Sequence, residues 1–111
     1  MATHTTIQIS ITIRKDFFQG IRDVGFDIAY WARVDAFNML IEDETGTGYG
    51  PLDDAMIHRG IESILSGETK VNTAIVGNIL RAVSESEPGH LDGTDTDCII
   101  QAACFRDIVY G

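Results

Sequence analysis

Three short stretches of the chain contain residue types that could do chemistry. The first runs from Gly46 to Gly50 with glycines at alternate positions, the composition of a phosphate-binding loop. Such a loop follows a strand, opens directly into a helix and often brings a lysine. Here Pro51 comes next, and five nearby carboxylates would repel a phosphate. We therefore interpret these glycines as a turn between two strands.

The second stretch places three carboxylates, those of Asp92, Asp95 and Asp97, within six residues. A calcium loop needs ligands at fixed alternating positions and a distal bidentate glutamate. That glutamate is missing here, and the spacing differs. We interpret the three acids as helix-start residues, which favour the positive end of the helix dipole. No dedicated metal site is expected, although weak adventitious binding of Ca²⁺ or Mg²⁺ stays open.

The third candidate is His58 with Glu62, four residues apart in a predicted helix. An exposed pair of this spacing is an ordinary helix-surface interaction. The other histidines, His4 and His90, lie far away in sequence, and no serine has a nucleophile motif around it. We therefore predict a protein that is not an enzyme and uses no cofactor. A small hydrolase or nuclease with a site assembled from distant residues stays open as an alternative.

The acidic residues are concentrated in two windows that contain no lysine or arginine. The net charge is −9, and residues 34–58 carry six acids while residues 82–105 carry five. One interpretation is that these acids keep the protein soluble and complement helix dipoles. The other is that a window forms a negative surface, which repels nucleic acid and attracts a basic protein.

The functional interpretation assigns partner binding to specific residues of the two windows. The first window combines acids on a turn, acids just beyond it and a tyrosine that could anchor a partner. Its predicted binding residues are Glu42, Asp43, Glu44, Tyr49, Asp53 and Asp54. The second window contributes Glu85, Glu87, Asp92 and Asp95.

The elements that must position these residues begin with a strand. Ile7, Ile9, Ile11 and Ile13 alternate with polar residues, so a strand over residues 7–13 would have one apolar face. A helix is predicted over residues 16–29, and a strand over residues 30–42. A turn and a short return strand near residues 49–52 follow.

Three further helices are predicted from their start and stop signals. Asp53 can cap the first, which Gly67 ends, and Asn72 can cap the second. Pro88-Gly89 breaks the chain before a third, which Thr94 and Asp97 would start. The predicted inward faces are Ile57, Ile61, Ile64 and Leu65; Ile75, Ile79, Leu80 and Val83; and Cys98, Ala102, Phe105 and Val109.

This order of elements predicts one α+β domain over residues 1–111, a small antiparallel sheet from the N-terminal half packed against about four helices. The hydrophobic fraction of 44% is typical of a globular protein. No signal peptide or membrane helix is recognisable, so we expect a cytoplasmic protein. Cys98 and Cys104 are six residues apart in a predicted helix, which points them to different sides and predicts free thiols.

The chain resembles a group of small proteins of phages, prophages and plasmids, most of which have no assigned function. Three stretches carry the likeness: the alternating start with Tyr30-Trp31-Ala32 after the first helix; Ile57-His58-Arg59-Gly60-Ile61; and a closing segment. That segment contains Asp97, Gln101, Phe105 and Val109-Tyr110-Gly111. One departure is Arg106, where the group often has glycine. The resemblance implies an origin in a mobile genetic element in a bacterial host.

We therefore expect a non-enzymatic protein that inhibits a host defence or nucleic-acid-processing complex, of anti-CRISPR or anti-restriction type. Its partner would be a host protein with a basic or nucleic-acid-binding surface, without direct contact to nucleic acid or membrane. The alternative is an accessory protein that mediates protein–protein assembly through a sheet edge. Because the strand over residues 7–13 has no charge or proline to protect its edge, either another strand covers that edge, or it pairs with a second copy in a homodimer or with a partner.

Overall fold

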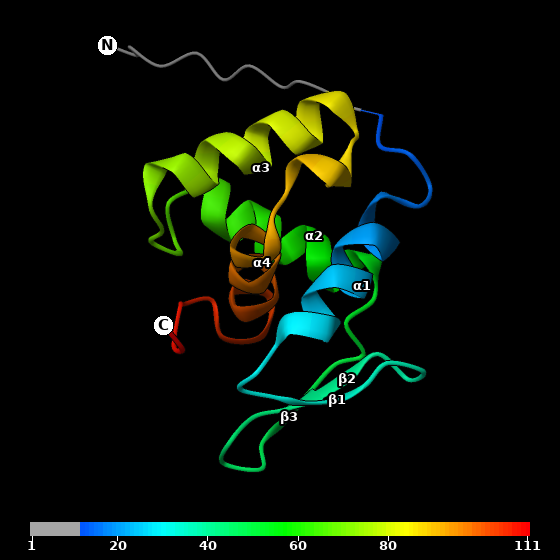
Figure 1. Cartoon of the computed structure of the whole chain (residues 1–111). Helices are drawn as coiled ribbons and strands as arrows, with labels where there is room; N and C mark the ends of the chain where they lie inside the picture. Colours follow the sequence, from blue (N-terminus) through cyan, green and yellow to red (C-terminus); the bar gives the residue numbers. More distant parts are fainter. Residues whose placement is uncertain (1–11) are drawn as a thin grey trace, which may run out of the picture.

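The computed structural model describes residues 12–111, which form an α+β fold of four α-helices and a three-stranded antiparallel sheet. The sheet lies at one end of the molecule, and α3 lies at the other (Figure 1). In chain order the elements are α1 (Phe17–Ile28), β1 (Arg33–Asp35), β2 (Leu40–Glu42), β3 (Gly48–Tyr49), α2 (Asp54–Leu65), α3 (Thr73–Glu85), the 3₁₀ helix η1 (Pro88–His90) and α4 (Gly93–Phe105).

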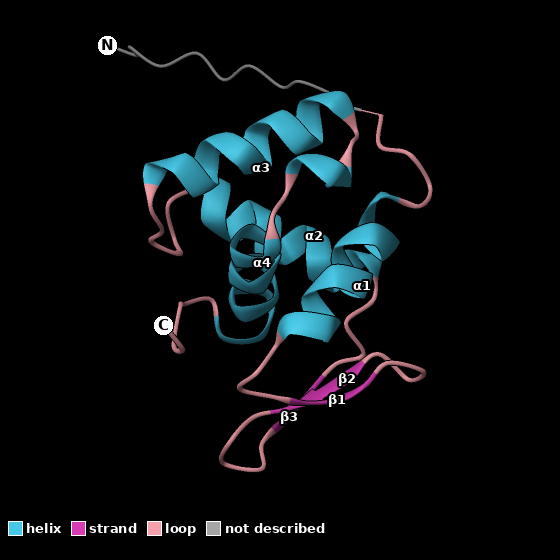
Figure 2. Ribbon diagram, viewed as in Figure 1, coloured by secondary structure: helices cyan, strands magenta, loops and turns pink. Residues whose placement is uncertain are grey.

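Helix α4 is the centre of the helical part and packs against both α1 and α2 (Figure 2). All five residues from Cys98 to Ala102 are buried, so the helix is covered on nearly every side. Two glycines allow the close approach of its neighbours. A Cβ added at Gly60 of α2 would lie 2.6 Å from the carbonyl oxygen of Ile99, and one at Gly25 of α1 would lie 2.7 Å from Ile100 Cγ1.

The predicted starts of α2 and α3 are confirmed. The side chain of Asp53 accepts a hydrogen bond from Met56 N, and that of Asn72 accepts one from Ala74 N. The predicted start of the last helix is wrong by two residues. Asp92 and Asp95 form a reciprocal capping box there, because each carboxylate accepts the backbone N–H of the other residue.

The predicted single strand over residues 30–42 is wrong, because the chain reverses within it. Strands β1 and β2 pair as a hairpin with Val34 opposite Ile41, and residues 36–39 form the turn. The carboxylate of Asp35 accepts hydrogen bonds from the backbone N–H and side-chain amide of Asn38, which stabilises this turn. The return strand is confirmed near its predicted position, as Gly48–Tyr49.

One predicted strand lies outside the described residues, and two residues predicted to face inward are exposed. The strand over residues 7–13 falls outside the described residues except for Thr12 and Ile13, which have no regular secondary structure. Leu80 of α3 is 50% exposed rather than inward, and Ala82 is fully buried in its place. Val109 lies beyond the end of α4 and is exposed. None of the helices in residues 12–111 is long and apolar enough to cross a membrane.

Candidate protein-binding surface

Asp43 organises the turn between β2 and β3. Its Oδ1 accepts hydrogen bonds from the backbone N–H and hydroxyl of Thr45 and from the backbone N–H of Thr47. Its Oδ2 accepts one from the hydroxyl of Tyr49. These bonds hold the pKa of Asp43 below its ordinary value, and the bond from the Thr45 side chain has the largest effect. The carboxylate is therefore ionised, and both of its oxygens are already bonded to Thr45, Thr47 and Tyr49.

Tyr49 is placed by packing rather than left free as an anchor. Its ring meets Phe105 edge to face, with ring centroids 5.0 Å apart, and the side chain is half-buried. Burial, together with the hydrogen bond to Asp43, raises the pKa of its hydroxyl. Tyr49 thus joins the sheet to the end of α4 and presents little free surface to a partner.

The two acids just beyond the turn also have structural partners. Asp53 caps α2, as described above, and Asp54 Oδ1 lies 2.7 Å from Arg22 Nη1. The Arg22 side chain is only 7% exposed, and it also donates to the carbonyl oxygen of Leu52. Asp54 therefore neutralises a buried guanidinium, which would be costly to leave without a counter-ion.

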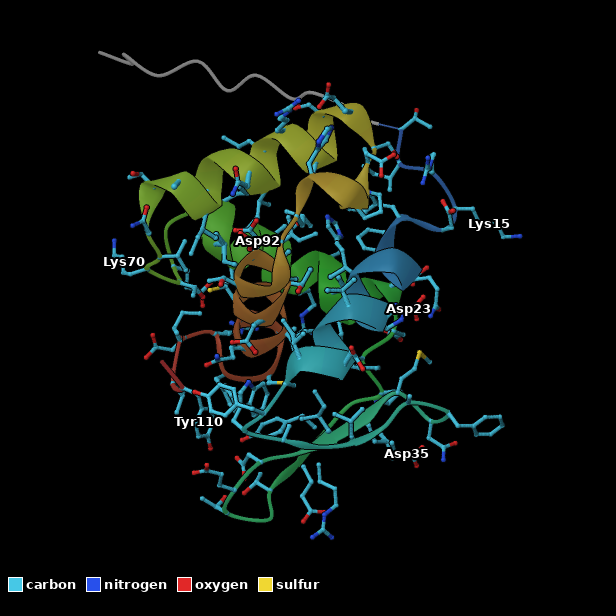
Figure 3. The ribbon with its side chains drawn as sticks, in the orientation of Figure 1. Lys15, Asp23, Asp35, Lys70, Asp92 and Tyr110 are labelled. Carbon is cyan, nitrogen blue, oxygen red and sulfur yellow. The ribbon has the colours of Figure 1, made fainter. Side chains whose placement is uncertain are left out.

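The acids of the second window are engaged in the same way. Glu85 contacts Arg81 at 3.1 Å and His90 at 2.7 Å, and Glu87 caps η1 through the N–H of Gly89. Asp92 and Asp95 form the capping box of α4, and Asp95 is buried against Asn78. Burial raises the pKa of Asp95. Asp92 at the start of α4 and Asp35 on the sheet lie far apart (Figure 3).

Glu42 and Glu44 are the acids of the first window that remain free. Both are exposed, and neither has a hydrogen bond or ion pair from its side chain to any residue in 12–111. They line a pocket of about 420 Å³ together with Tyr30, whose side chain is 70% exposed. Arg33 stands opposite Glu42 in the β1–β2 pairing and lines the same pocket, so the acids Glu42, Asp43 and Glu44 outnumber the cation there.

The outer face of the sheet continues this exposed region. Along β1 and β2 the side chains of Val34 and Ile41 point toward the core, whereas their neighbours are exposed. Gly48 and Gly50 have no side chains to fill the same face, which is hollowed by a pocket of about 420 Å³. We define the hairpin surface as the exposed charged and large apolar residues of β1, β2 and their turns: Arg33, Asp35, Phe37, Leu40, Glu42 and Glu44.

Phe37 at the tip of the hairpin is the residue that the sequence analysis missed. Its side chain is 94% exposed, and Leu40 nearby is 41% exposed. The predicted single strand over residues 30–42 placed both residues inside a strand, so their exposure on a hairpin was not expected. The available signal was Asp35 three residues before Asn38, a spacing typical of a turn in which the first side chain bonds the backbone. The hairpin surface thus combines free carboxylates with exposed apolar groups.

The groups that could do reaction chemistry lie apart from the hairpin surface. Within residues 12–111, no three side chains of His, Cys, Asp or Glu come close enough to hold a metal ion. His58 Nε2 lies 3.1 Å from Glu62 Oε1, the exposed pair expected from their spacing.

Residues from two of the three stretches that carry the resemblance form a separate cluster. Trp31 stacks on Tyr110 with ring centroids 5.1 Å apart and lies 5.4 Å from Phe105. Gln101 is fully buried between them and the chain end, and its Oε1 accepts the N–H groups of Val109 and Tyr110. This cluster holds the last residues of the chain against α4.

Comparison of the chain with protein-family models, curated proteins and solved structures gave no match. The resemblance to phage and plasmid proteins stays a prediction.

Proposed function

We propose that this protein is a non-enzymatic inhibitor from a phage or related mobile element, which binds a host defence or nucleic-acid-processing protein through the hairpin surface. The observation that carries the proposal is the pair of free, exposed carboxylates of Glu42 and Glu44. They lie in a stretch, residues 34–58, that contains six acids and no lysine or arginine. Such a surface repels nucleic acid and attracts a protein surface built to bind phosphates.

The rigidity of the surrounding turns supports this assignment. Asp43 holds the β2–β3 turn through four hydrogen bonds, so Glu42 and Glu44 are carried on a defined backbone. Carboxylates at fixed positions can occupy the sites of a basic groove where a nucleic acid places its phosphates. Occupation of that groove would block the host complex, as expected for an inhibitor of anti-CRISPR or anti-restriction type.

Assembly through a sheet edge is a weaker candidate on the described residues. The two edge strands, β1 and β3, have three and two residues, so each offers few backbone groups to a partner strand. The exposed face and tip of the hairpin present a larger and more distinctive surface. We therefore place partner binding on the face rather than on the edges.

A phage-challenge assay tests the proposal. Bacteria with an active CRISPR or restriction system would express the full chain and be infected with a targeted phage. Phage plating should recover when the parent chain is expressed. The double variant Glu42→Lys and Glu44→Lys should abolish this recovery, because it reverses the two free charges. Asp43 is left unchanged, because its reversal would disrupt the turn.

The matched control reverses two exposed glutamates elsewhere, with Glu62→Lys and Glu68→Lys. Both variants change the net charge equally, and the ion pairs lost in the control are exposed and contribute little to folding. The control should protect phage as the parent does. Equal protection by both variants would exclude the hairpin surface, and no protection by the parent in any system tested would exclude the inhibitor function.

A further inference from the structure

Phe37 is the one phenylalanine of the chain whose side chain is exposed to solvent. The chain has five phenylalanines, and the other four are buried or half-buried: Phe17, Phe18, Phe26 and Phe105. Phe37 is 94% exposed at the tip of the hairpin. A large aromatic ring in water is unfavourable, and burial of that ring in a partner would favour association.

The turn that carries Phe37 has a single defined shape. Both oxygens of the Asp35 carboxylate accept hydrogen bonds from Asn38, and Met39 N donates to the carbonyl oxygen of Ala36 over 3.3 Å. Met39 has a φ of 57°, in the left-handed region that a side chain disfavours. A conformation of this kind persists only when its surroundings enforce it, and such positions often serve recognition.

The base of the turn is fixed to the core. Leu52 is fully buried, and its backbone N–H donates to the carbonyl oxygen of Met39 over 2.7 Å. A Cβ added at Gly50 would lie 2.7 Å from the same oxygen, so the two segments are in close contact. Phe37 is therefore presented by a preorganised turn, which lowers the entropy cost of binding.

The charges around this tip are acidic. Asp35 ends β1 directly before the turn, and Asp53 directly follows Leu52, which is bonded to the base of the tip. Arg22 and Asp54 neutralise each other, and the exposed cation of the hairpin surface, Arg33, is at the end of β1 away from the tip. A complementary partner would present basic side chains around an apolar site.

We propose that Phe37 is the anchor of the interface and inserts into an apolar pocket of the partner protein that is bordered by lysine or arginine. This inference rests on the proposed function, because it names the contact through which the hairpin surface binds. Leu40 on the same hairpin extends the apolar contact, and Glu42, which shares the exposed face of β2 with Leu40, pairs with the basic border. Anchors of this type, a central aromatic within a polar rim, contribute most of the affinity of many interfaces.

Photo-crosslinking in the bacterium that carries the defence system identifies the protein in contact with this residue. The full chain would be expressed with the photoreactive amino acid p-benzoylphenylalanine at position 37. The matched control has the same amino acid at position 80, where Leu80 is 50% exposed on α3 at the opposite end. Irradiation should give a specific adduct from position 37, and excess parent chain should suppress it. No adduct above the control would overturn the inference.

The adduct only identifies the candidate partner. The affinity of that partner for the parent chain and for Phe37→Ala tests whether Phe37 is the anchor. The crosslinked protein would be purified and titrated calorimetrically with the parent and with Phe37→Ala. The substitution should weaken binding at least about 30-fold, with an unchanged melting temperature because the side chain is exposed. An affinity within about threefold of the parent, or a crosslinked site without basic neighbours, would overturn the anchor.

Failure of the anchor and failure of the proposed function give different results. If Phe37→Ala binds normally but Glu42→Lys with Glu44→Lys loses both binding and phage protection, the proposed function stands and the anchor is wrong. If Phe37→Ala loses a basic partner but the parent protects no phage, the anchor stands and the inhibitor function is wrong.

Discussion

The indole Nε1 of Trp31 donates a hydrogen bond to Oδ1 of Asp97 over 2.8 Å, between residues 66 positions apart in the chain. The other carboxylate oxygen of Asp97 accepts a bond from Gln101, whose amide in turn holds the backbone of Tyr110. Tyr110 completes the arrangement by stacking on the same indole. Asp97 is therefore an internal acceptor, although the sequence placed it among the capping acids of the second window.

Gln101→Ala should lower the free energy of unfolding by about 3 kcal/mol. The side chain is fully buried and makes four hydrogen bonds, including those to the N–H groups of Val109 and Tyr110, which would lose their partner. Urea unfolding followed by Trp31 fluorescence measures the change. Tyr110→Phe, which retains the stacked ring, should unfold close to the parent. A loss below about 0.5 kcal/mol for Gln101→Ala would contradict this account.

Gly60→Ala and Gly77→Ala should change stability in opposite directions. Both glycines are helical, but a Cβ at Gly60 would meet the carbonyl oxygen of Ile99 at 2.6 Å, whereas a Cβ at Gly77 would meet nothing within 4 Å. We expect the first variant to lose about 2 kcal/mol from overpacking and the second to gain about 0.5–1 kcal/mol from helix propensity. Thermal unfolding of the pair checks this, and equal shifts would refute the close α2–α4 packing.

Arg106→Gly should stabilise the protein by about 0.5–1 kcal/mol. Arg106 ends α4 with a φ of 58°, a conformation that glycine adopts without the steric cost of a Cβ. The ion pair with Glu68 would be lost, but it is exposed and contributes little. The bond from the Thr69 hydroxyl to the backbone carbonyl of residue 106 remains. A lower melting temperature would show that the arginine side chain stabilises this end.

The carboxyl group of Asp43 should titrate below its ordinary pKa of 3.8, because hydrogen bonds from Thr45, Thr47 and Tyr49 favour the ionised form. Thr45→Ala removes the largest cause and should raise the pKa toward 3.8, which carboxyl carbon NMR would detect. Because the pKa is lowered on folding, this group stabilises the fold fully above pH 3.8 and loses that effect as the pH falls through its folded pKa. An unchanged midpoint in Thr45→Ala would contradict the hydrogen-bond assignment.

Both thiols should react slowly with alkylating reagents near pH 8 in the folded protein and rapidly in denaturant. Cys98 and Cys104 are free, as expected from their spacing. Burial raises the pKa of Cys98 to about 11 and that of Cys104 to about 12, so little reactive thiolate forms. Because the unfolded thiols ionise near pH 9, stability should decline as the pH rises beyond that value. Rapid labelling of the native protein would contradict the burial.

The local features of this fold could be read from the sequence. Asp53 and Asn72 cap their helices by bonding backbone groups two or three residues away, and Gly67 follows α2 with a φ of 83°. These interactions depend on neighbours in the chain, so residue type and spacing suffice to predict them. The α+β class follows from the same local patterns.

The functional surface depends on contacts that the sequence does not display. The sequence determined the number of acids in each window, but the tertiary structure decided that Asp54 pairs with Arg22 while Glu42 stays free. It also decided that Phe37 stands at the tip of a turn rather than within a strand. Whether a charge or a ring is buried, paired or exposed depends on segments distant in the chain, because burial and counter-ions set its free energy.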